Sequence, residues 1–203
     1  MEEQYFTQAP TSDHHYQEVS LELNDEHLKF KTDNGVFSKN RIDYGSLALL
    51  KAITQSAEIV SGDWLDLGTG YGPMGLYLAK TFPDYLVHMV DVNERSLQLA
   101  SENAKTNQID NVKIYESSCY DNVEGKFAAI ATNPPIRAGK TVVSTMLKDA
   151  FNYLVEGGQL WAVLQKKQGA PSAKKLMQET FGNVKVVAKD KGYYILQAVK
   201  EAR

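Results

Sequence analysis

The stretch that decides the fold reads Asp66-Leu67-Gly68-Thr69-Gly70-Tyr71-Gly72-Pro73-Met74-Gly75, the end of an apolar run followed by closely spaced glycines. Glycines let the backbone turn tightly and approach a ligand without a Cβ in the way. Pro73 suits the first turn of a helix, because its fixed φ is already helical there. We therefore expect a strand, a ligand-binding turn and a helix in this order, as in α/β proteins that bind ligands at the carboxyl ends of their strands.

Outward from this turn, apolar strands and amphipathic helices alternate along the chain. Short apolar runs predict strands, and apolar residues three and four apart predict helices. The strands are expected near 64–67, 86–90, 112–115, 127–131, 160–164, 184–187 and 193–196, and the helices from residue 45 and over 74–81, 94–105, 142–154 and 173–181. A Lys191-Gly192 turn should join the last two strands as a hairpin. The alternation predicts a three-layer, doubly wound Rossmann-like α/β sheet, mostly parallel, with an antiparallel C-terminal hairpin.

Three local features refine these elements. Ser46 is the expected N-cap of the helix that begins at Gly45. Gly157-Gly158 is the expected stop of the helix that begins near Val142. Tyr193-Tyr194 is interpreted as side-chain packing in an edge strand.

The first part of the chain has a different character. Residues 1–44 are polar, with short alternating runs at 19–23 and 28–31 that predict two short strands in an N-terminal β-rich extension. Residues 45–203 are expected to form a single globular domain, because a chain of 203 residues rarely holds two independent cores.

Composition limits the possible partners. The chain is 43% hydrophobic and 23% charged, and no apolar run approaches the roughly 18 residues of a membrane span. Residues 1–5 lack the basic and apolar stretches of a secretion signal, so we expect a cytoplasmic protein. The net charge of −3 argues against nucleic-acid binding over the whole surface but leaves room for local basic clusters. The single cysteine, Cys119, and four histidines without a metal-binding spacing predict no metal site.

Two ligands compete for the glycine-rich turn. Gly70 to Gly75 satisfies G-x-G-x-x-G, and Asp91 follows about twenty residues later, as in dinucleotide-binding proteins. Asp66, however, lies directly before the glycines, where a carboxylate would repel a pyrophosphate but suits the ammonium group of S-adenosylmethionine. Asp91 can accept hydrogen bonds from the ribose of either ligand. Asp66 therefore favours S-adenosylmethionine.

A second turn supplies the expected chemistry. Asn133-Pro134-Pro135-Ile136 follows the predicted strand 127–131, at the same edge of the sheet as the glycines. Two prolines fix the backbone and remove two N–H donors. The Asn133 side-chain oxygen and the Pro134 carbonyl can each accept a hydrogen bond from one planar amino group, which leaves its nitrogen directed at a methyl donor. This turn predicts methyl transfer to a nitrogen.

Four stretches carry a family resemblance. Gly35-Val36-Phe37-Ser38, Asp43-Tyr44-Gly45-Ser46, residues 66–75 and residues 133–140 occur in this order. Residues 66–72 and Asp91 are similar to the first two motifs of class I S-adenosylmethionine-dependent methyltransferases. The four stretches together resemble the catalytic domain of the small-subunit ribosomal RNA guanine N2-methyltransferases, the RsmC-like group, from about residue 25 onward. The resemblance implies S-adenosylmethionine as methyl donor, and ribosomal RNA or the small ribosomal subunit as partner.

The resemblance also assigns residues. Asn133, Pro134 and Pro135 are the expected catalytic turn, and cofactor contacts are expected from Asp66, Gly68, Thr69, Gly70, Tyr71, Gly72, Asp91, Val92, Ser118, Cys119 and Asn133. Ser118 and Cys119 stand where relatives often have an acidic residue, and Ile136 where they have an aromatic one. Substrate contacts are expected from Ile136 and, with RNA phosphates, from Arg137, Lys140, Lys166 and Lys167.

Two other functions use the same features. The Asn133 turn could position a protein glutamine amide equally well, although Ile136 favours this less than an aromatic residue would. A cofactor-binding, RNA-associated protein without turnover is the third hypothesis, but such a protein has no use for Asn133.

Overall fold

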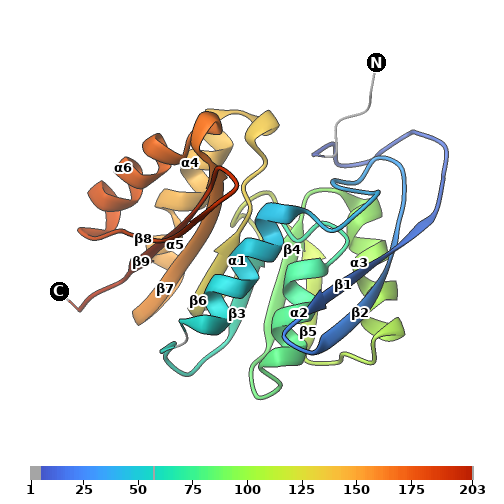
Figure 1. Ribbon diagram of the computed structural model, residues 1–203, viewed down its shortest axis with the longest axis horizontal. Coiled ribbons are helices and arrows are strands. Elements are labelled where there is room, and N and C mark those ends of the chain that lie inside the picture. Colours follow the sequence, from blue (N-terminus) through green and yellow to red (C-terminus); the bar gives the residue numbers. More distant parts are fainter. Residues whose placement is uncertain (1–5, 57, 203) are drawn as a thin grey trace.

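Seven strands form the central sheet of a computed structural model that describes residues 6–56 and 58–202. Their order is β5-β4-β3-β6-β7-β9-β8 (Figure 1). The strands are β3 (Trp64–Leu67), β4 (Val87–Asp91), β5 (Val112–Glu116), β6 (Phe127–Thr132), β7 (Leu154–Gln165), β8 (Lys185–Asp190) and β9 (Tyr193–Val199). The first five strands in this order, from β5 through β4, β3 and β6 to β7, are parallel to one another. Strand β9 pairs antiparallel with both β7 and β8. The predicted mostly parallel sheet with an antiparallel C-terminal hairpin is confirmed.

Helices cover both faces of this sheet. One face carries α1 (Tyr44–Gln55), α2 (Pro73–Thr81) and α3 (Glu94–Thr106); the other carries α4 (Lys140–Lys148), α5 (Ala150–Tyr153) and α6 (Ala170–Phe181). Alternate residues of a strand point to opposite faces. Trp64 thus packs in the apolar cluster of α1–α3, and Leu65 and Leu67 pack in the cluster of α4–α6. This is the expected three-layer arrangement.

The order of the strands reverses between β3 and β6. From β3 the chain moves outward through β4 to β5, then returns to pair β6 on the other side of β3. Ligands bind beyond the carboxyl ends of the strands where the order reverses in this way. The glycine-rich turn follows β3 and the Asn133 turn follows β6, so the topology brings both to the point where the order reverses.

The small N-terminal sheet is a hairpin of β1 (Gln17–Leu23) and β2 (Glu26–Thr32). Leu21, Leu28 and Phe30 are buried in the same apolar cluster as α1–α3. The Asn103 side chain joins β2 to α3, because it accepts from the Lys31 N–H at 2.7 Å and donates to its carbonyl at 3.1 Å. Residues 1–5 of the predicted extension lie outside the described residues.

Two predicted helix ends are wrong. The N-cap of α1 is Asp43, not Ser46, and its carboxylate accepts from the Ser46 N–H at 2.9 Å. Gly157-Gly158 lies inside β7 and ends no helix, since the helical region already ends at Tyr153. A Cβ on Gly158 would lie 3.0 Å from the Phe127 carbonyl oxygen, so this glycine serves a close approach of β7 to β6 at a register shift.

The interpretation of Tyr193-Tyr194 as edge-strand packing is also wrong. Strand β9 lies between β7 and β8, and β8 forms the edge. A chain order of strand, turn, strand does not reveal which of the two strands pairs with the rest of the sheet and which one forms its edge.

Membrane-spanning helices and metal-binding clusters are both absent from the described residues. Among residues 6–56 and 58–202, none of the helices combines the length and apolar character that spanning a bilayer requires. The same residues contain no group of three His, Cys, Asp or Glu side chains placed to hold a metal ion.

Candidate cofactor and amine site

A cavity of about 1230 Å³ opens above the carboxyl ends of β3 and β6. Most of the residues predicted for the site line it: Asp66, Gly68, Thr69, Gly70, Tyr71, Asp91, Val92, Ser118, Cys119, Asn133, Pro134, Pro135, Ile136 and Arg137. Gly72, Lys140, Lys166 and Lys167 are not among the lining residues. The fold therefore brings the two predicted turns into one cavity and leaves three of the four predicted cations outside its wall.

The glycine-rich turn has the backbone that its sequence predicts. Gly68, Gly70 and Gly72 adopt φ values of 82°, 58° and 105°, in the left-handed region that favours glycine. Gly72 is the N-cap of α2, and a Cβ there would lie 3.1 Å from side-chain atoms of both Leu76 and Met89. Gly72 thus allows α2 to pack closely on the sheet rather than lining the cavity.

Asp66 is a buried carboxylate with one free oxygen. Its Oδ2 accepts from the Thr69 hydroxyl at 2.6 Å, whereas its buried Oδ1 has no hydrogen-bond partner among the described residues. Burial raises the pKa of Asp66 to about 7, against the lowering effect of the Thr69 hydrogen bond. An unpartnered buried carboxylate oxygen is costly unless a cationic or N–H donor ligand meets it.

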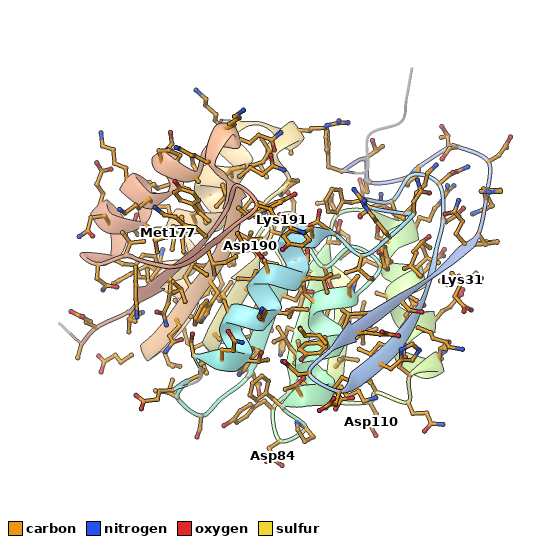
Figure 2. The ribbon with its side chains drawn as sticks, viewed as in Figure 1. Lys31, Asp84, Asp110, Met177, Asp190 and Lys191 are labelled. Atoms are coloured by element: carbon orange, nitrogen blue, oxygen red, sulfur yellow. The ribbon has the colours of Figure 1, made fainter. Side chains whose placement is uncertain are left out.

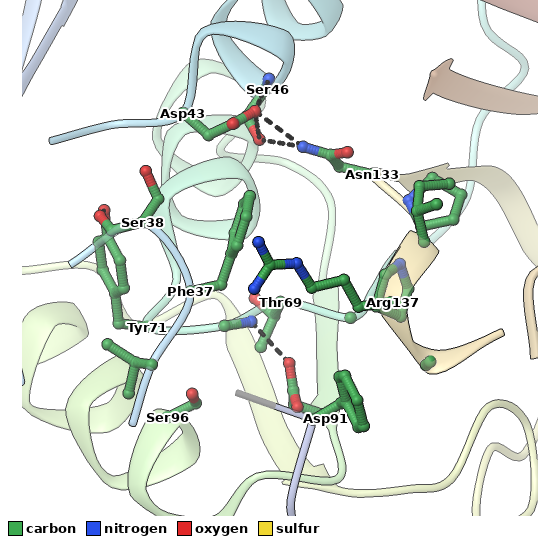
Figure 3. A pocket seen from close by; sticks show the side chains of 18 of the residues that line it. Phe37, Ser38, Asp43, Ser46, Thr69, Tyr71, Asp91, Ser96, Asn133 and Arg137 are labelled. Atoms are coloured by element: carbon green, nitrogen blue, oxygen red, sulfur yellow. Dashed lines mark hydrogen bonds between the residues drawn. The ribbon is translucent and has the colours of Figure 1, made fainter. Parts of the chain in front are cut away.

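Asp91 is the last residue of β4, the strand that pairs with β3. Its Oδ2 accepts from the Gly70 N–H at 2.8 Å (Figure 3). Its Oδ1 accepts from the Asn93 N–H at 2.9 Å. Burial raises its pKa, and these backbone hydrogen bonds oppose that effect. A carboxylate offers about four lone-pair sites, so Asp91 keeps accepting capacity for a ligand hydroxyl.

Asn133 is held by the loop that leads into α1. Its Nδ2 donates to Asp43 Oδ2 at 2.8 Å and to Ser46 Oγ at 3.0 Å (Figure 3). The preceding residue, Thr132, donates its hydroxyl to the Leu67 carbonyl at 2.8 Å, which ties the end of β6 to the end of β3. The two turns are therefore fixed relative to each other.

The two prolines shape the cavity wall behind Asn133. Pro134 is buried and Pro135 is half-buried. The Pro135 carbonyl accepts from the Ala138 N–H at 2.9 Å, in the short 3-10 helix η1 (Ile136–Ala138). Within the described part of the chain, no backbone N–H donates to the Pro134 carbonyl. That carbonyl and Asn133 Oδ1 are the acceptors that this turn offers to a ligand.

The structure adds lining residues that sequence reasoning did not assign to the site. Asp43, Ser46 and Phe37 come from the loop before α1, and Tyr193 from the start of β9. Figure 3 shows Arg137 reaching across the cavity toward Phe37. The Val-Phe-Ser and Asp-x-Gly-Ser stretches were the available signals for the first three, but no spacing rule links them to a turn some ninety residues later.

A segment before β1 also reaches the cavity, through Phe6, Thr11 and Ser12. Arg95 on α3 holds it: the guanidinium donates to the Pro10 carbonyl at 3.2 Å and to the Ser12 carbonyl at 2.9 Å. Polar, aperiodic residues gave no sequence signal for this contact.

Comparison with known proteins identifies the family and the fold. Residues 27–197 match the model of the methyltransferase small domain family. The chain belongs to this family. It is an S-adenosylmethionine-dependent methyltransferase with a Rossmann-like fold, as the sequence predicted, and the dinucleotide alternative is set aside.

Two relatives of this methyltransferase differ in how much of their own length the chain covers. The chain is 47% identical over 202 residues to the uncharacterized protein YbxB of Bacillus subtilis, covering 98% of this chain and all of that protein. It is 31% identical to ribosomal RNA small subunit methyltransferase C of Photorhabdus laumondii, covering 87% of this chain and 51% of the relative. The chain thus spans about half the length of the relatives with that second name.

A solved structure also resembles the methyltransferase over nearly its whole length. The 16S rRNA N2 G1207 methyltransferase (RsmC) of T. thermophilus, in complex with AdoMet and guanosine, has a TM-score of 0.83 and 25% sequence identity. The match covers 95% of this chain and 52% of that one.

Proposed function

We propose that this methyltransferase transfers a methyl group to the exocyclic N2 amine of a guanine in small-subunit ribosomal RNA. The observation that carries the proposal is the pair of free acceptors, Asn133 Oδ1 and the Pro134 carbonyl, in the same cavity as the glycine-rich turn. An amino group with two N–H donors fits this pair. The names of the RsmC relatives support a guanine in ribosomal RNA, and that substrate implies a cytoplasmic location.

The cavity fits S-adenosylmethionine. Asp66 Oδ1, buried and without a partner, suits the ammonium group, and Asp91 suits the ribose hydroxyls. Gly68 and Gly70 allow close approach of the backbone, and the other proposed contacts are Thr69, Tyr71, Val92, Ser118 and Cys119. When bound, the cofactor supplies an electrophilic methyl group on a sulfonium.

The chain itself contributes positioning. Asn133 Oδ1 and the Pro134 carbonyl accept the two hydrogens of the amine, which holds its nitrogen lone pair in one direction. The nitrogen held in this way would accept the methyl group that the bound cofactor supplies, and its proton would then pass to solvent. A base is not required first, because the nitrogen becomes acidic once it carries the methyl group.

Phe37 supports a planar base as the substrate. The family resemblance leads us to expect an aromatic residue at position 136, where this chain has Ile136, so the Asn133 turn offers no ring for base stacking. Phe37 lines the same cavity and is 40% exposed. A guanine can stack on this ring, whereas a glutamine amide gains little from it.

Cations at the rim support an RNA partner. We propose phosphate contacts for Arg137, Lys140, Lys166 and Lys167, all of which are exposed. The ion pairs that Lys and Arg side chains form within the described residues lie elsewhere, at Lys31, Lys80, Arg95 and Lys175. The rim cations therefore keep their charge available for phosphates.

The hairpin tip adds a further cation to this rim. Lys166 donates its N–H to the Gly192 carbonyl at 2.8 Å, which brings Lys191 beside the Lys166 turn. In Figure 2, Asp84 and Asp110 lie at the opposite end of the sheet from Lys191, whereas the exposed Asp190 lies beside it. A net charge of −3 is thus compatible with a locally basic RNA surface.

The test is incubation of the protein with radiolabelled S-adenosylmethionine and one of three acceptors: small ribosomal subunits, naked ribosomal RNA or a release factor. We expect label in RNA, recovered as N2-methylguanine after digestion. Label in a protein glutamine would favour the amide alternative. Cofactor binding without transfer to any acceptor would favour the binding protein without turnover.

A further inference from the structure

The stretch Asp43-Tyr44-Gly45-Ser46 has a role beyond starting α1. Asp43 Oδ2 accepts from the Ser46 N–H at 2.9 Å and from the Ser46 hydroxyl at 3.3 Å, which accounts for the helix cap. A cap needs no contact with another part of the chain. Here the same carboxylate oxygen also accepts from Asn133 Nδ2 at 2.8 Å, across ninety residues of sequence.

Both hydrogens of the Asn133 amide are used in this way. One goes to Asp43 Oδ2 and the other to Ser46 Oγ, at 3.0 Å. An ionised carboxylate can only accept hydrogen bonds, so the nitrogen of the amide must face Asp43. The oxygen of Asn133 is therefore left for the cavity, and the amide cannot flip without placing two oxygens against each other.

Gly45 makes room for this arrangement. A Cβ on Gly45 would lie 2.7 Å from Tyr193 Cε1 and 3.1 Å from Asp43 Oδ2. Tyr193 lines the cavity and its hydroxyl accepts from Gln165 Nε2 at 2.9 Å. The glycine thus lets the Tyr193 ring and the Asp43 carboxylate approach the start of α1 together.

We propose that Asp43 and Ser46 are positioning residues, which fix the Asn133 amide with its oxygen toward the cavity and so make the site selective for an N–H donor. The role of the amide in transfer rests on the function proposed above, but its orientation does not. A free amide would spend part of its time with its NH2 group toward the cavity, where it would repel an amino group. The fixed orientation removes that state.

The orientation is tested without substrate, by hydrogen exchange of side-chain amides in NMR spectra of the ligand-free protein. The Asn133 signals are assigned by their loss in Asn133→Ala. We expect their exchange to be slower than that of the exposed Asn152 by roughly tenfold or more, because both protons are hydrogen-bonded. Asp43→Gly and Ser46→Ala should bring the two rates close together. Equal rates in the unmodified protein would overturn the proposal.

These variants are chosen to spare the fold. Glycine is nearly as good an N-cap as aspartate, so Asp43→Gly removes the carboxylate at a small cost to α1. Ser46→Ala keeps the backbone N–H that meets the cap. Thr54→Ala removes a hydroxyl from the far end of the same helix and is the matched control, expected to leave the Asn133 exchange rate unchanged.

The coupling is tested by single-turnover methyl transfer in a double-mutant cycle. Asp43→Gly should lower the transfer rate by about tenfold and change cofactor affinity less than about twofold. In the Asn133→Ala background the same change should alter the rate less than about twofold, because its target is already absent. An equal loss in both backgrounds would show that Asp43 acts by another route and would overturn the proposal.

The two measurements separate this proposal from the proposed function. If the Asn133 amide is protected in an Asp43-dependent way but no RNA is methylated, the orientation stands and the substrate assignment fails. If RNA is methylated and the amide exchanges freely, the substrate assignment stands and the positioning role fails.

Discussion

Asn133 supplies geometry rather than charge or basicity. Its amide is neutral and its two hydrogens are committed to Asp43 and Ser46, so the side chain offers one fixed oxygen. Replacing it with alanine should leave S-adenosylmethionine affinity within a few-fold, while methyl transfer falls by roughly 100-fold. Calorimetric binding and single-turnover rates measure the two effects. Near-normal turnover in Asn133→Ala would contradict the mechanism.

Asp66 makes cofactor binding sensitive to pH. Its ionised form attracts the ammonium group, and its pKa in the ligand-free protein is raised to about 7. Below this pH the carboxyl must lose a proton before it can pair, so the dissociation constant should rise by about tenfold per pH unit. Titrations between pH 5 and 8 measure this, with Asp66→Asn as the variant that should bind weakly at every pH. A flat profile for the unmodified protein would remove the pairing.

The same residue costs stability. Because its folded-state pKa lies above the value of 3.8 in the unfolded chain, the folded protein holds an extra proton between these values. Stability from this group is present below about pH 4 and is lost as the pH rises through about 7. Asp66→Asn should therefore raise the melting temperature of the ligand-free protein more at pH 8 than at pH 4.5. Equal effects at the two pH values would place the ionisation elsewhere.

At the scale of elements, the sequence predicts well which helices and strands exist and in what order, but it predicts less well where each of them begins and ends. The strand-helix alternation, the hairpin at Lys191-Gly192 and the glycine turn are all in place. The predicted cap of α1 is wrong because Asp43 and Ser46 are both good N-caps, and it is the Asp43 carboxylate that accepts from the Ser46 N–H. The stop at Gly157-Gly158 is wrong because a glycine that allows close strand approach looks the same as one that ends a helix.

Helix α2 gives an element-scale test of the packing beneath the cofactor loop. Alanine is a better helix former than glycine by about 1 kcal/mol, so propensity alone would make Gly75→Ala stabilising. A Cβ there would lie 2.6 Å from Met89 Cγ and 2.9 Å from Asp66 Oδ2. We expect overpacking to dominate, with a net loss of about 1–3 kcal/mol in urea unfolding and weaker cofactor binding. A more stable variant would contradict this packing.

The segment before β1 gives a second test at this scale. Its contacts with Arg95 and a Glu94 N–H donated to the Gln8 carbonyl at 2.9 Å place it over the cavity beside α3. Arg95→Ala should loosen the segment, since the guanidinium side chain is only 11% exposed and the substitution removes its hydrogen bonds to Pro10 and Ser12. The dissociation rate of S-adenosylmethionine, followed by stopped-flow fluorescence, should increase several-fold. Lys105→Ala, at the other end of α3, is the matched control.

At the scale of the whole molecule, topology explains why the site could be largely predicted. Parallel strands place every strand-to-helix turn at one edge, so Asp66, Asp91 and Asn133 had to meet. Phe37, Asp43 and the segment before β1 reach the cavity through loops, whose paths follow from tertiary packing and not from a repeat in the sequence. The distribution of charge also depends on tertiary packing, so the net charge of −3 does not reveal which cations lie at the rim.

The rim gives the whole-molecule prediction. Arg137→Glu with Lys140→Glu removes two exposed cations beside the Asn133 turn and leaves the Asp66 and Asp91 contacts intact. Each phosphate contact contributes a released counterion, so RNA affinity should fall and the slope of log K against log salt should become less negative by about 1–2. Cofactor affinity should stay within about twofold. The same reversal at Lys174 and Lys175 on α6, exposed but away from the cavity wall, is the control. An unchanged salt slope would show that the RNA approaches by another face, because the loss of a phosphate contact at this rim must change the slope.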